Sequence, residues 1–130
     1  MIVDTSALLA IAFGEPDAAR FVDAMTGASG TEMAAPGWVE AAITVARRGG
    51  DTALLDRLVA ELGVTVRPFT TDHARAALSA FVAFGKGRHA AALNYGDCMS
   101  YAVARCEGQP LLFKGQEFPR TDIEPALRDR

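Results

Sequence analysis

Three carboxylates in this sequence occupy positions where a carboxylate could do chemistry. Asp4 follows the β-branched pair Ile2-Val3, which is typical of the end of a short buried strand, and it precedes a helical run. Glu40 lies among apolar residues of an expected helix, and Asp97 begins another helix. Open α/β sheets bind ligands at the carboxyl ends of their strands. A second interpretation of Asp4, as a simple turn or capping residue, is the usual role of a single aspartate.

These acids together predict a metal site. Carboxylates that share a site without a neighbouring cation raise one another's pKa, and a hard divalent cation relieves that repulsion. Mg²⁺ takes one or two carboxylates together with waters and phosphate oxygens. The chemistry that follows is hydrolysis of a phosphodiester by metal-activated water, with one ion or two. Glu117 and Asp122 are later candidates for the same site.

The composition limits where a nucleic acid could be held. The chain has 130 residues, half of them hydrophobic, so we expect a single domain over residues 1–130 with a true core. The net charge is 13 − 16 = −3, which does not favour coating of a polyanion through overall charge. A phosphate backbone therefore needs a local basic group. The densest one is Lys86, Arg88 and His89, in what we expect to be a flexible loop with glycines at 85 and 87.

The sequence also suggests where the protein acts. It has no apolar run of about 18 residues, so we expect no membrane span. The N-terminus lacks the basic start of a secretory signal. Cys98 and Cys106 lie eight residues apart in one expected helix, too far apart to form a disulfide there. We interpret both as buried thiols in a reducing cytoplasm.

Short apolar strands alternate with helices along the chain. Strands are expected at residues 2–3, 32–35, 64–66 and 109–113. Thr5-Ser6 should cap the first helix, and Pro36 should begin a helix to Arg48 that buries Val39, Ile43 and Ala46. A later helix from Thr71-Asp72 should turn inward Ala74, Leu78, Phe81 and Val82, with His73 at its cap or surface. This alternation predicts an α/β fold of three α/β/α layers, with a short parallel sheet covered by helices on both sides.

Several stretches together resemble PIN-domain ribonucleases of the VapC toxin type. They are the opening Ile2-Val3-Asp4-Thr5-Ser6-Ala7-Leu8, the acid at 40, the long segment 85–102, and the ending 110–115 with 121–123. The opening alone is a weak signal, whereas segment 85–102 is a specific one. The resemblance implies that Asp4, Glu40 and Asp97 are metal ligands and catalytic. Where such proteins often have an aspartate before a phenylalanine, this chain has Glu117 as fourth catalytic acid, with Asp122 as the alternative.

The resemblance also implies a function. It is that of a magnesium-dependent endoribonuclease, with Mn²⁺ as a substitute, acting as the toxin of a type II toxin–antitoxin pair. The implied partners are a VapB-type antitoxin, an RNA substrate such as tRNA or rRNA, and a second copy of the chain. The apolar hairpin over residues 8–25 is the surface we expect for the second copy or the antitoxin. The alternative is a PIN fold kept as a catalytically inactive RNA- or protein-binding module, which the presence of the three acids argues against.

Four polar residues could support the acids from nearby. Ser6 flanks Asp4, and Asn94 precedes Asp97 by one tight turn. Ser100 could face the same pocket, and Asp122 is the possible replacement for Glu117. For Asn94 and Ser100, local capping is the simpler role. We expect Lys86, Arg88 and His89 to contact RNA phosphates.

Overall fold

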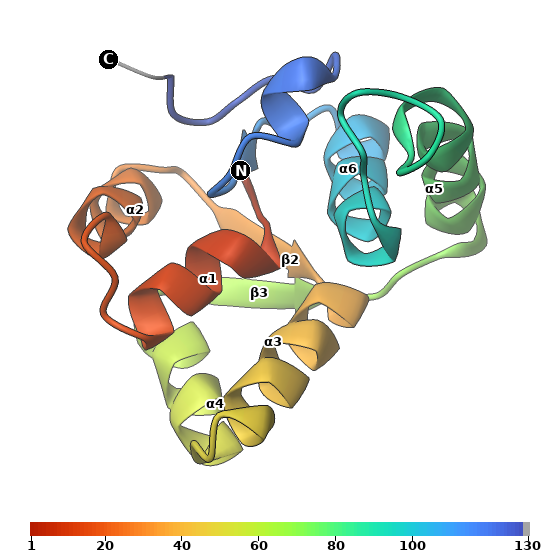
Figure 1. The fold of residues 1–130 in the computed structure, drawn as a ribbon. Helices are drawn as coiled ribbons and strands as arrows, with labels where there is room; N and C mark the ends of the chain where they lie inside the picture. The colour runs from red at the N-terminus through yellow and green to blue at the C-terminus, as the bar shows by residue number, and fades with distance from the viewer. Residues whose placement is uncertain (129–130) are drawn as a thin grey trace.

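The computed structural model describes residues 1–128 and has a four-stranded parallel sheet at its centre (Figure 1). The strands are β1 Ile2–Val3, β2 Thr31–Ala34, β3 Val64–Arg67 and β4 Leu111–Leu112, in the spatial order β3-β2-β1-β4. Ile2 pairs with Glu32 on one side and with Leu111 on the other. The strand that ends at Asp4 is therefore an interior strand of the sheet.

Six α-helices and one 3-10 helix surround this sheet. They are α1 Thr5–Ala12, α2 Ala18–Thr26, α3 Ala35–Arg47, α4 Thr52–Glu61, α5 Thr71–Phe84, α6 Tyr95–Glu107 and η1 Phe118–Arg120, within residues 1–128. In Figure 1, α5 and α6 lie together on one side of the sheet, and α1, α2 and α4 lie on the other. The predicted three-layer α/β/α fold is confirmed.

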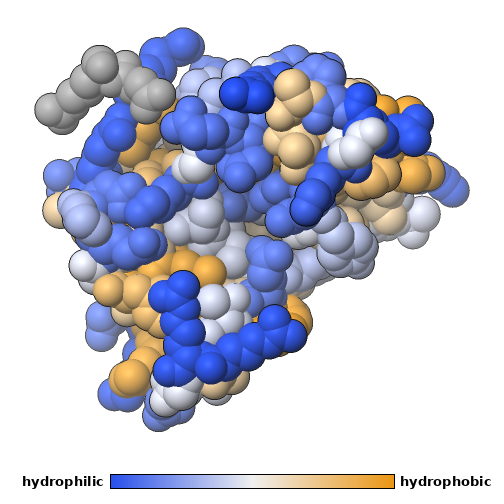
Figure 2. Space-filling view, viewed as in Figure 1, coloured by the Kyte–Doolittle hydropathy of each residue, from blue (hydrophilic) through white to orange (hydrophobic). Residues whose placement is uncertain are grey.

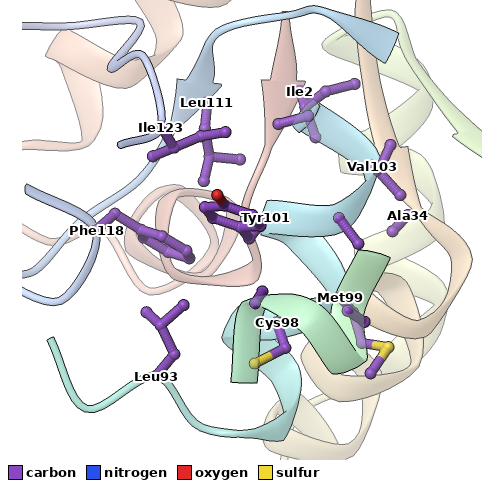
Figure 3. Close-up of a cluster of buried hydrophobic side chains, with 14 residues drawn as sticks. Ile2, Ala34, Leu93, Cys98, Met99, Tyr101, Val103, Leu111, Phe118 and Ile123 are labelled. Atoms are coloured by element: carbon purple, nitrogen blue, oxygen red, sulfur yellow. The ribbon is translucent and has the colours of Figure 1, made fainter. Parts of the chain in front are cut away.

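Successive residues of β1 and β4 point to opposite faces of the sheet and are buried in two separate hydrophobic cores. Ile2 and Leu111 are fully buried against α5 and α6, whereas Val3 and Leu112 are buried on the side of α1 to α4. This alternation is the period of two that a strand imposes on its side chains. Figure 3 shows Leu111 in the first of these cores, beside Phe118 and other buried side chains. Both faces of the sheet are therefore buried at β1 and β4, whereas Thr65 and Val66 of the edge strand β3 are exposed.

Helix α3 buries a different face from the predicted one. Val39 and Ile43 were expected inside, but they are 48% and 47% exposed, and Ala46 is exposed as well. The buried residues of α3 are instead Ala41, Val45 and Gly37. Small residues let a helix come close to its neighbours, so the smaller face lies inward although both faces are apolar.

Helix α5 shows the same reversal. Leu78, Phe81 and Val82 are 66%, 37% and 54% exposed, and Ala74 is exposed too. The inward positions are His73, Ala77 and Ala80. His73 does cap the helix as expected, because its Nδ1 accepts a hydrogen bond from the Thr70 N–H at 3.0 Å. It is nevertheless only 3% exposed, so it is not a surface residue.

The cysteines differ from one another. Cys98 in α6 is buried, as predicted. Cys106, near the end of the same helix, was also predicted to be buried but is exposed. The two thiols are not bridged. None of the helices in residues 1–128 is both long and apolar enough to span a bilayer.

A pair of matched leucine substitutions tests the orientation of α5. Leu93, just before α6, is fully buried, and we expect Leu93→Ala to lower the free energy of unfolding by about 2–5 kcal/mol through the cavity it leaves. Leu78→Ala, at an exposed site, should change it by about 0.5 kcal/mol or less. Urea denaturation followed by circular dichroism measures both. Equal losses for the two variants would contradict the observed packing of α5.

Candidate active site

Asp4 is held at the carboxyl end of β1 by both backbone and side chain. Its N–H donates to the carbonyl of Leu112 in β4 at 2.8 Å, which continues the sheet by one residue. Its Oδ2 accepts hydrogen bonds from the N–H of Ser6 at 3.0 Å and from the Ser6 hydroxyl at 2.6 Å. Asp4 is thus itself the N-cap of α1, a role predicted for Thr5 and Ser6, which lie inside the helix. It caps a helix and is also only 4% exposed.

Burial governs the ionisation of Asp4. Removal from water raises the pKa of this carboxyl above its usual value, while hydrogen bonds from the hydroxyls of Ser100 and Ser6 partly oppose that rise. Ser100, on the second turn of α6, is 2% exposed. It therefore faces the acid site and does not cap its own helix.

Asp97 enters the site from the first turn of α6. The Asn94 side chain accepts from the Asp97 N–H at 2.8 Å, and Asp97 accepts from the Asn94 N–H at 3.0 Å, which forms a capping box. Burial raises the pKa of Asp97 to about 6. The hydrogen bond from Asn94 lowers it, and the charges of Asp4, Glu117 and Glu40 raise it further. The partial positive charge of the helix N-terminus favours the ionised form of Asp97, but burial and its acidic neighbours outweigh that effect.

Glu40 approaches from the second turn of α3. Its pKa is raised mainly by burial and also by the charge of Asp4, while the hydroxyl of Thr5 opposes the rise. On the facing helix, a Cβ atom added to Gly96 would overlap a carboxylate oxygen of Glu40. The two helices can therefore hold Glu40 in this place only because residue 96 has no side chain.

The two candidates for the fourth acid lie in different surroundings. Glu117 lies just before η1, and its charge contributes to the raised pKa of Asp97. Asp122 instead accepts a hydrogen bond from the hydroxyl of Tyr101 and pairs with Arg105 at 3.6 Å. The structure thus brings Glu117 near Asp97 and places Asp122 against α6.

The basic loop is better ordered than its glycines suggested. Lys86 donates its N–H to the carbonyl of Leu93 at 2.9 Å, and the Arg88 side chain donates to the carbonyl of Val82 at 3.2 Å. The side chains of Lys86, Arg88 and His89 are exposed. Among residues 1–128, none of them forms an ion pair with the four acids. The three basic side chains therefore project from the surface just before α6, on a loop whose backbone is hydrogen-bonded to Leu93.

The donor set of this site suits a divalent metal ion. None of the four acids has a lysine, arginine or histidine partner in the described part of the chain. Carboxylate oxygens are the ligands that Mg²⁺ prefers, and a divalent charge would favour the ionised forms of Asp4, Glu40 and Asp97, whose pKa values are raised mainly by burial. Within residues 1–128, however, no three acidic, histidine or cysteine side chains converge closely enough to coordinate one ion together. The acids surround a common region without forming a finished coordination shell.

Two residues that shape this site, Gly96 and Lys114, were not predicted from the sequence. Gly96 had a usable signal, because a glycine in the first turn of a helix lowers helix stability and so indicates a need for space. Lys114 had none. Its N–H donates to the Ser6 hydroxyl at 2.9 Å, and its ammonium group binds Glu15 at 3.1 Å and Asp17 at 3.2 Å. These contacts span about a hundred residues of sequence, so only the folded chain reveals them.

Comparison with known proteins agrees with this arrangement. The family model described as PIN domain matches residues 1–124. Ribonuclease VapC36 of Mycobacterium tuberculosis is 48% identical over 127 residues, which are 95% of this chain and 91% of that protein. Ribonuclease VapC42 of the same organism is 43% identical over 129 residues, covering 97% of this chain and 98% of the relative.

Two solved structures share the fold. Mycobacterium tuberculosis VapC20, described as a toxin that cleaves the sarcin–ricin loop, has a TM-score of 0.76 at 18% identity, covering 94% of this chain and 95% of that one. A toxin–antitoxin complex from Klebsiella pneumoniae has a TM-score of 0.64 at 14% identity, and the match covers 85% of this chain and 82% of that one. Because the family model and the VapC relatives both match nearly the whole chain, this protein belongs to the PIN-domain family, among the VapC ribonucleases.

Proposed function

We propose that Asp4, Glu40 and Asp97 hold a magnesium ion in this VapC-type ribonuclease, with Mn²⁺ able to replace it, and that Glu117 completes the catalytic group. Ribonucleases of this family generally depend on a divalent metal. The observation that carries the proposal is that four carboxylates from four different segments share one electrostatic environment with no cation among them. Their place at the carboxyl ends of β1 and β4 is where an open parallel sheet presents a ligand site.

The residues divide the work of phosphodiester hydrolysis between them. When bound, a divalent ion supplies positive charge and lowers the pKa of an attacking water. Asp4 is held by two hydrogen bonds from Ser6, and Ser100 helps to favour its ionised form. Glu40 is only half buried and has a raised pKa, which suits a group that takes up a proton during the reaction. Asn94 orients Asp97 through the capping box.

The substrate we propose is a structured RNA, either tRNA or rRNA, in the cytoplasm. The protein would cut this RNA at an internal phosphodiester bond. The description of VapC20 as a toxin that cleaves the sarcin–ricin loop supports a structured target. Lys86, Arg88 and His89 remain our candidates for contacts with RNA phosphates, because they form an exposed basic projection next to the helix that carries Asp97. Asp122 is left as a structural residue that ties the C-terminal segment to α6. A catalytically inactive PIN module is the less favoured alternative, since all four acids are present.

We also propose that the protein pairs with an antitoxin and with a second copy of itself. Part of the hairpin 8–25 belongs to the core, because Leu8, Phe21 and Met25 are buried, whereas Ile11 and Phe13 remain partly exposed and line a groove with α4. Figure 2 shows apolar side chains gathered in two areas, one over α1 and α4, which includes this part of the hairpin, and one over α5.

The two apolar areas differ in charge. The groove between α1, α3 and α4, of about 470 Å³, combines Ile11, Phe13, Leu54 and Leu58 with charged residues on its rim, which suits an amphipathic antitoxin helix. The α3–α5–α6 face is defined by Val39, Ile43, Leu78, Phe81, Val82 and Tyr95. The hollow that α5 and α6 form on this face has no charged lining residue, and depletion of charge is typical of interfaces between identical subunits. We assign the first surface to the antitoxin and the second to the second copy.

Neutral replacement of single acids tests the site. We expect Asp4→Asn and Asp97→Asn each to lower cleavage of structured RNA by at least about 100-fold with Mg²⁺ present. Mutation of a residue that only supports a metal ligand already lowers metal affinity or activity by about 10–100-fold. Asp122→Asn is the matched control and should cleave normally. A gel assay with magnesium, manganese or chelator measures all three variants. Near-normal cleavage by either of the first two would refute the assignment.

The pH dependence of stability tests the crowding of the acids. The folded pKa of Asp97, about 6, exceeds the usual aspartate value of 3.8, so the folded state binds this proton more tightly than the unfolded state does. Its contribution to stability is therefore full below about pH 4 and is lost as the pH rises to about 6. In chelator, the melting temperature of the wild type should fall across that window relative to Asp97→Asn. Parallel curves for the two proteins would contradict the raised pKa.

A pair of leucine replacements separates the two docking surfaces. Leu78 and Leu54 are both exposed, at 66% and 54%, and lie on the two different surfaces. We expect Leu78→Asp to convert a dimer into a monomer while antitoxin binding is kept, because a buried unpaired charge is costly at an apolar interface. Leu54→Asp should do the reverse. Light scattering and titration calorimetry measure the two properties, and the opposite pattern would exchange the assignments.

A further inference from the structure

A cavity of about 610 Å³ lies beside the acid site, between α2 and the segment that follows β4. Its wall includes Arg20 from α2, residues 113–116 after β4, and Arg128 from the C-terminal segment. The volume falls within the range of pockets that bind small molecules. No residue of the four-acid site lines this cavity, so it is a separate feature of the surface.

We propose that this cavity binds one nucleotide of the RNA substrate, next to the bond that is cut, and selects it by its base. The inference rests on the proposed ribonuclease function and assigns it a specificity subsite. Three features support it: the charge of the cavity, the groups that could hold a base, and the connection of its wall to Asp4.

The cavity is locally basic in an acidic protein. Its lining holds three cations, Arg20, Lys114 and Arg128, and one acid, Asp17, whereas the whole chain carries −3. Lys114 is already neutralised, because Glu15 and Asp17 both bind its ammonium group. Arg20 makes one side-chain hydrogen bond within residues 1–128, to the carbonyl of Arg128 at 2.7 Å. A guanidinium has five N–H donors, so Arg20 keeps donors for a phosphate.

The opposite wall offers groups that suit a base. Phe113 is half buried, and its ring packs on Phe118 with centroids 5.2 Å apart, which keeps it in place. Unpaired RNA bases commonly stack on such rings and are read by hydrogen bonds along their edges. Gln116 is exposed, and its side-chain amide makes no hydrogen bond within residues 1–128. An amide carries both donors and an acceptor, as a base edge does.

The cavity wall is tied directly to the acid site. The N–H of Lys114 donates to the Ser6 hydroxyl at 2.9 Å, and that hydroxyl donates to Asp4 at 2.6 Å. Immediately beyond it, Gly115 has a φ of +117° and lies against the Glu117 carboxylate. Two hydrogen bonds therefore separate the cavity wall from Asp4, and a nucleotide bound here would adjoin the acids.

Matched charge reversals test the phosphate contact. Arg20→Glu and Arg57→Glu, the latter on α4, both lower the net charge by 2, which in the Asp4→Asn background means from −2 (−3 + 1) to −4 (−2 − 2). Each is placed in an Asp4→Asn background, which should not cleave, and titrated with a short fluorescein-labelled single-stranded RNA. Arg20→Glu should bind more weakly, with a salt slope shallower by about 0.7 for one lost contact. Arg57→Glu should keep the slope of its parent.

Equal affinities and slopes in these two variants would overturn the proposal. Melting curves of both variants check that they fold, and Arg20→Gln serves as a second variant without charge reversal. If Arg20→Glu keeps its RNA affinity but loses the antitoxin, the cavity belongs to a peptide and the proposal fails as well.

Base selection has its own test. In the wild-type background, Gln116→Ala should change the nucleotide preferred at one position beside the cut, as read by sequencing the products from a pool of randomised RNA. Its salt slope should not change, because phosphate contacts position the RNA and base contacts specify it. An unchanged preference would refute base reading. If the wild type cleaves no RNA at all, the ribonuclease function fails, while the binding comparison still decides whether the cavity takes a nucleotide.

Discussion

The burial of acidic side chains at the carboxyl edge of the sheet is the constraint around which this chain is built. Asp4 is buried and Glu40 and Asp97 are half buried, and burial raises the pKa of each of them, with the charge of Asp4 adding to the rise at Glu40 and Asp97. No ion pair within residues 1–128 neutralises these acids. Such a group stays together only if each member is fixed separately. Asp4 is fixed by the sheet and Ser6, Asp97 by a capping box, and Glu40 by close approach of two helices. The stability needed to hold them comes from two dry cores, one on each face of the sheet.

Local signals in the sequence were enough to find most of this arrangement. The strand before Asp4 and the Asn94–Asp97 capping box depend on residues that are adjacent or three apart, and such patterns are readable without a structure. The alternation of strands and helices was likewise enough to predict a parallel sheet with helices on both sides. The choice between Glu117 and Asp122 was not readable, because it depends on where Tyr101 and Arg105 lie after folding.

The directions in which α3 and α5 face could not be predicted for a different reason. Each helix has apolar residues on more than one side, so periodicity marks two possible inner faces. Hydropathy favours the larger side chains, such as Leu78 and Ile43, whereas the folded chain buries the smaller Ala77 and Ala41. Close helix packing needs small residues, and the larger ones remain exposed at the surface. Contacts such as Lys114 with Ser6 escaped prediction because they join distant parts of the chain.

Gly96 has a consequence for how such a gene changes over generations. Alanine would favour the helix by about 1 kcal/mol, yet its methyl group would push aside the Glu40 carboxylate. The displaced atoms are the flexible end of a side chain, so the fold would survive. One codon change therefore moves one acid of the site without unfolding the chain. On the function proposed above, the resulting allele would be an inactive protein that still binds its antitoxin.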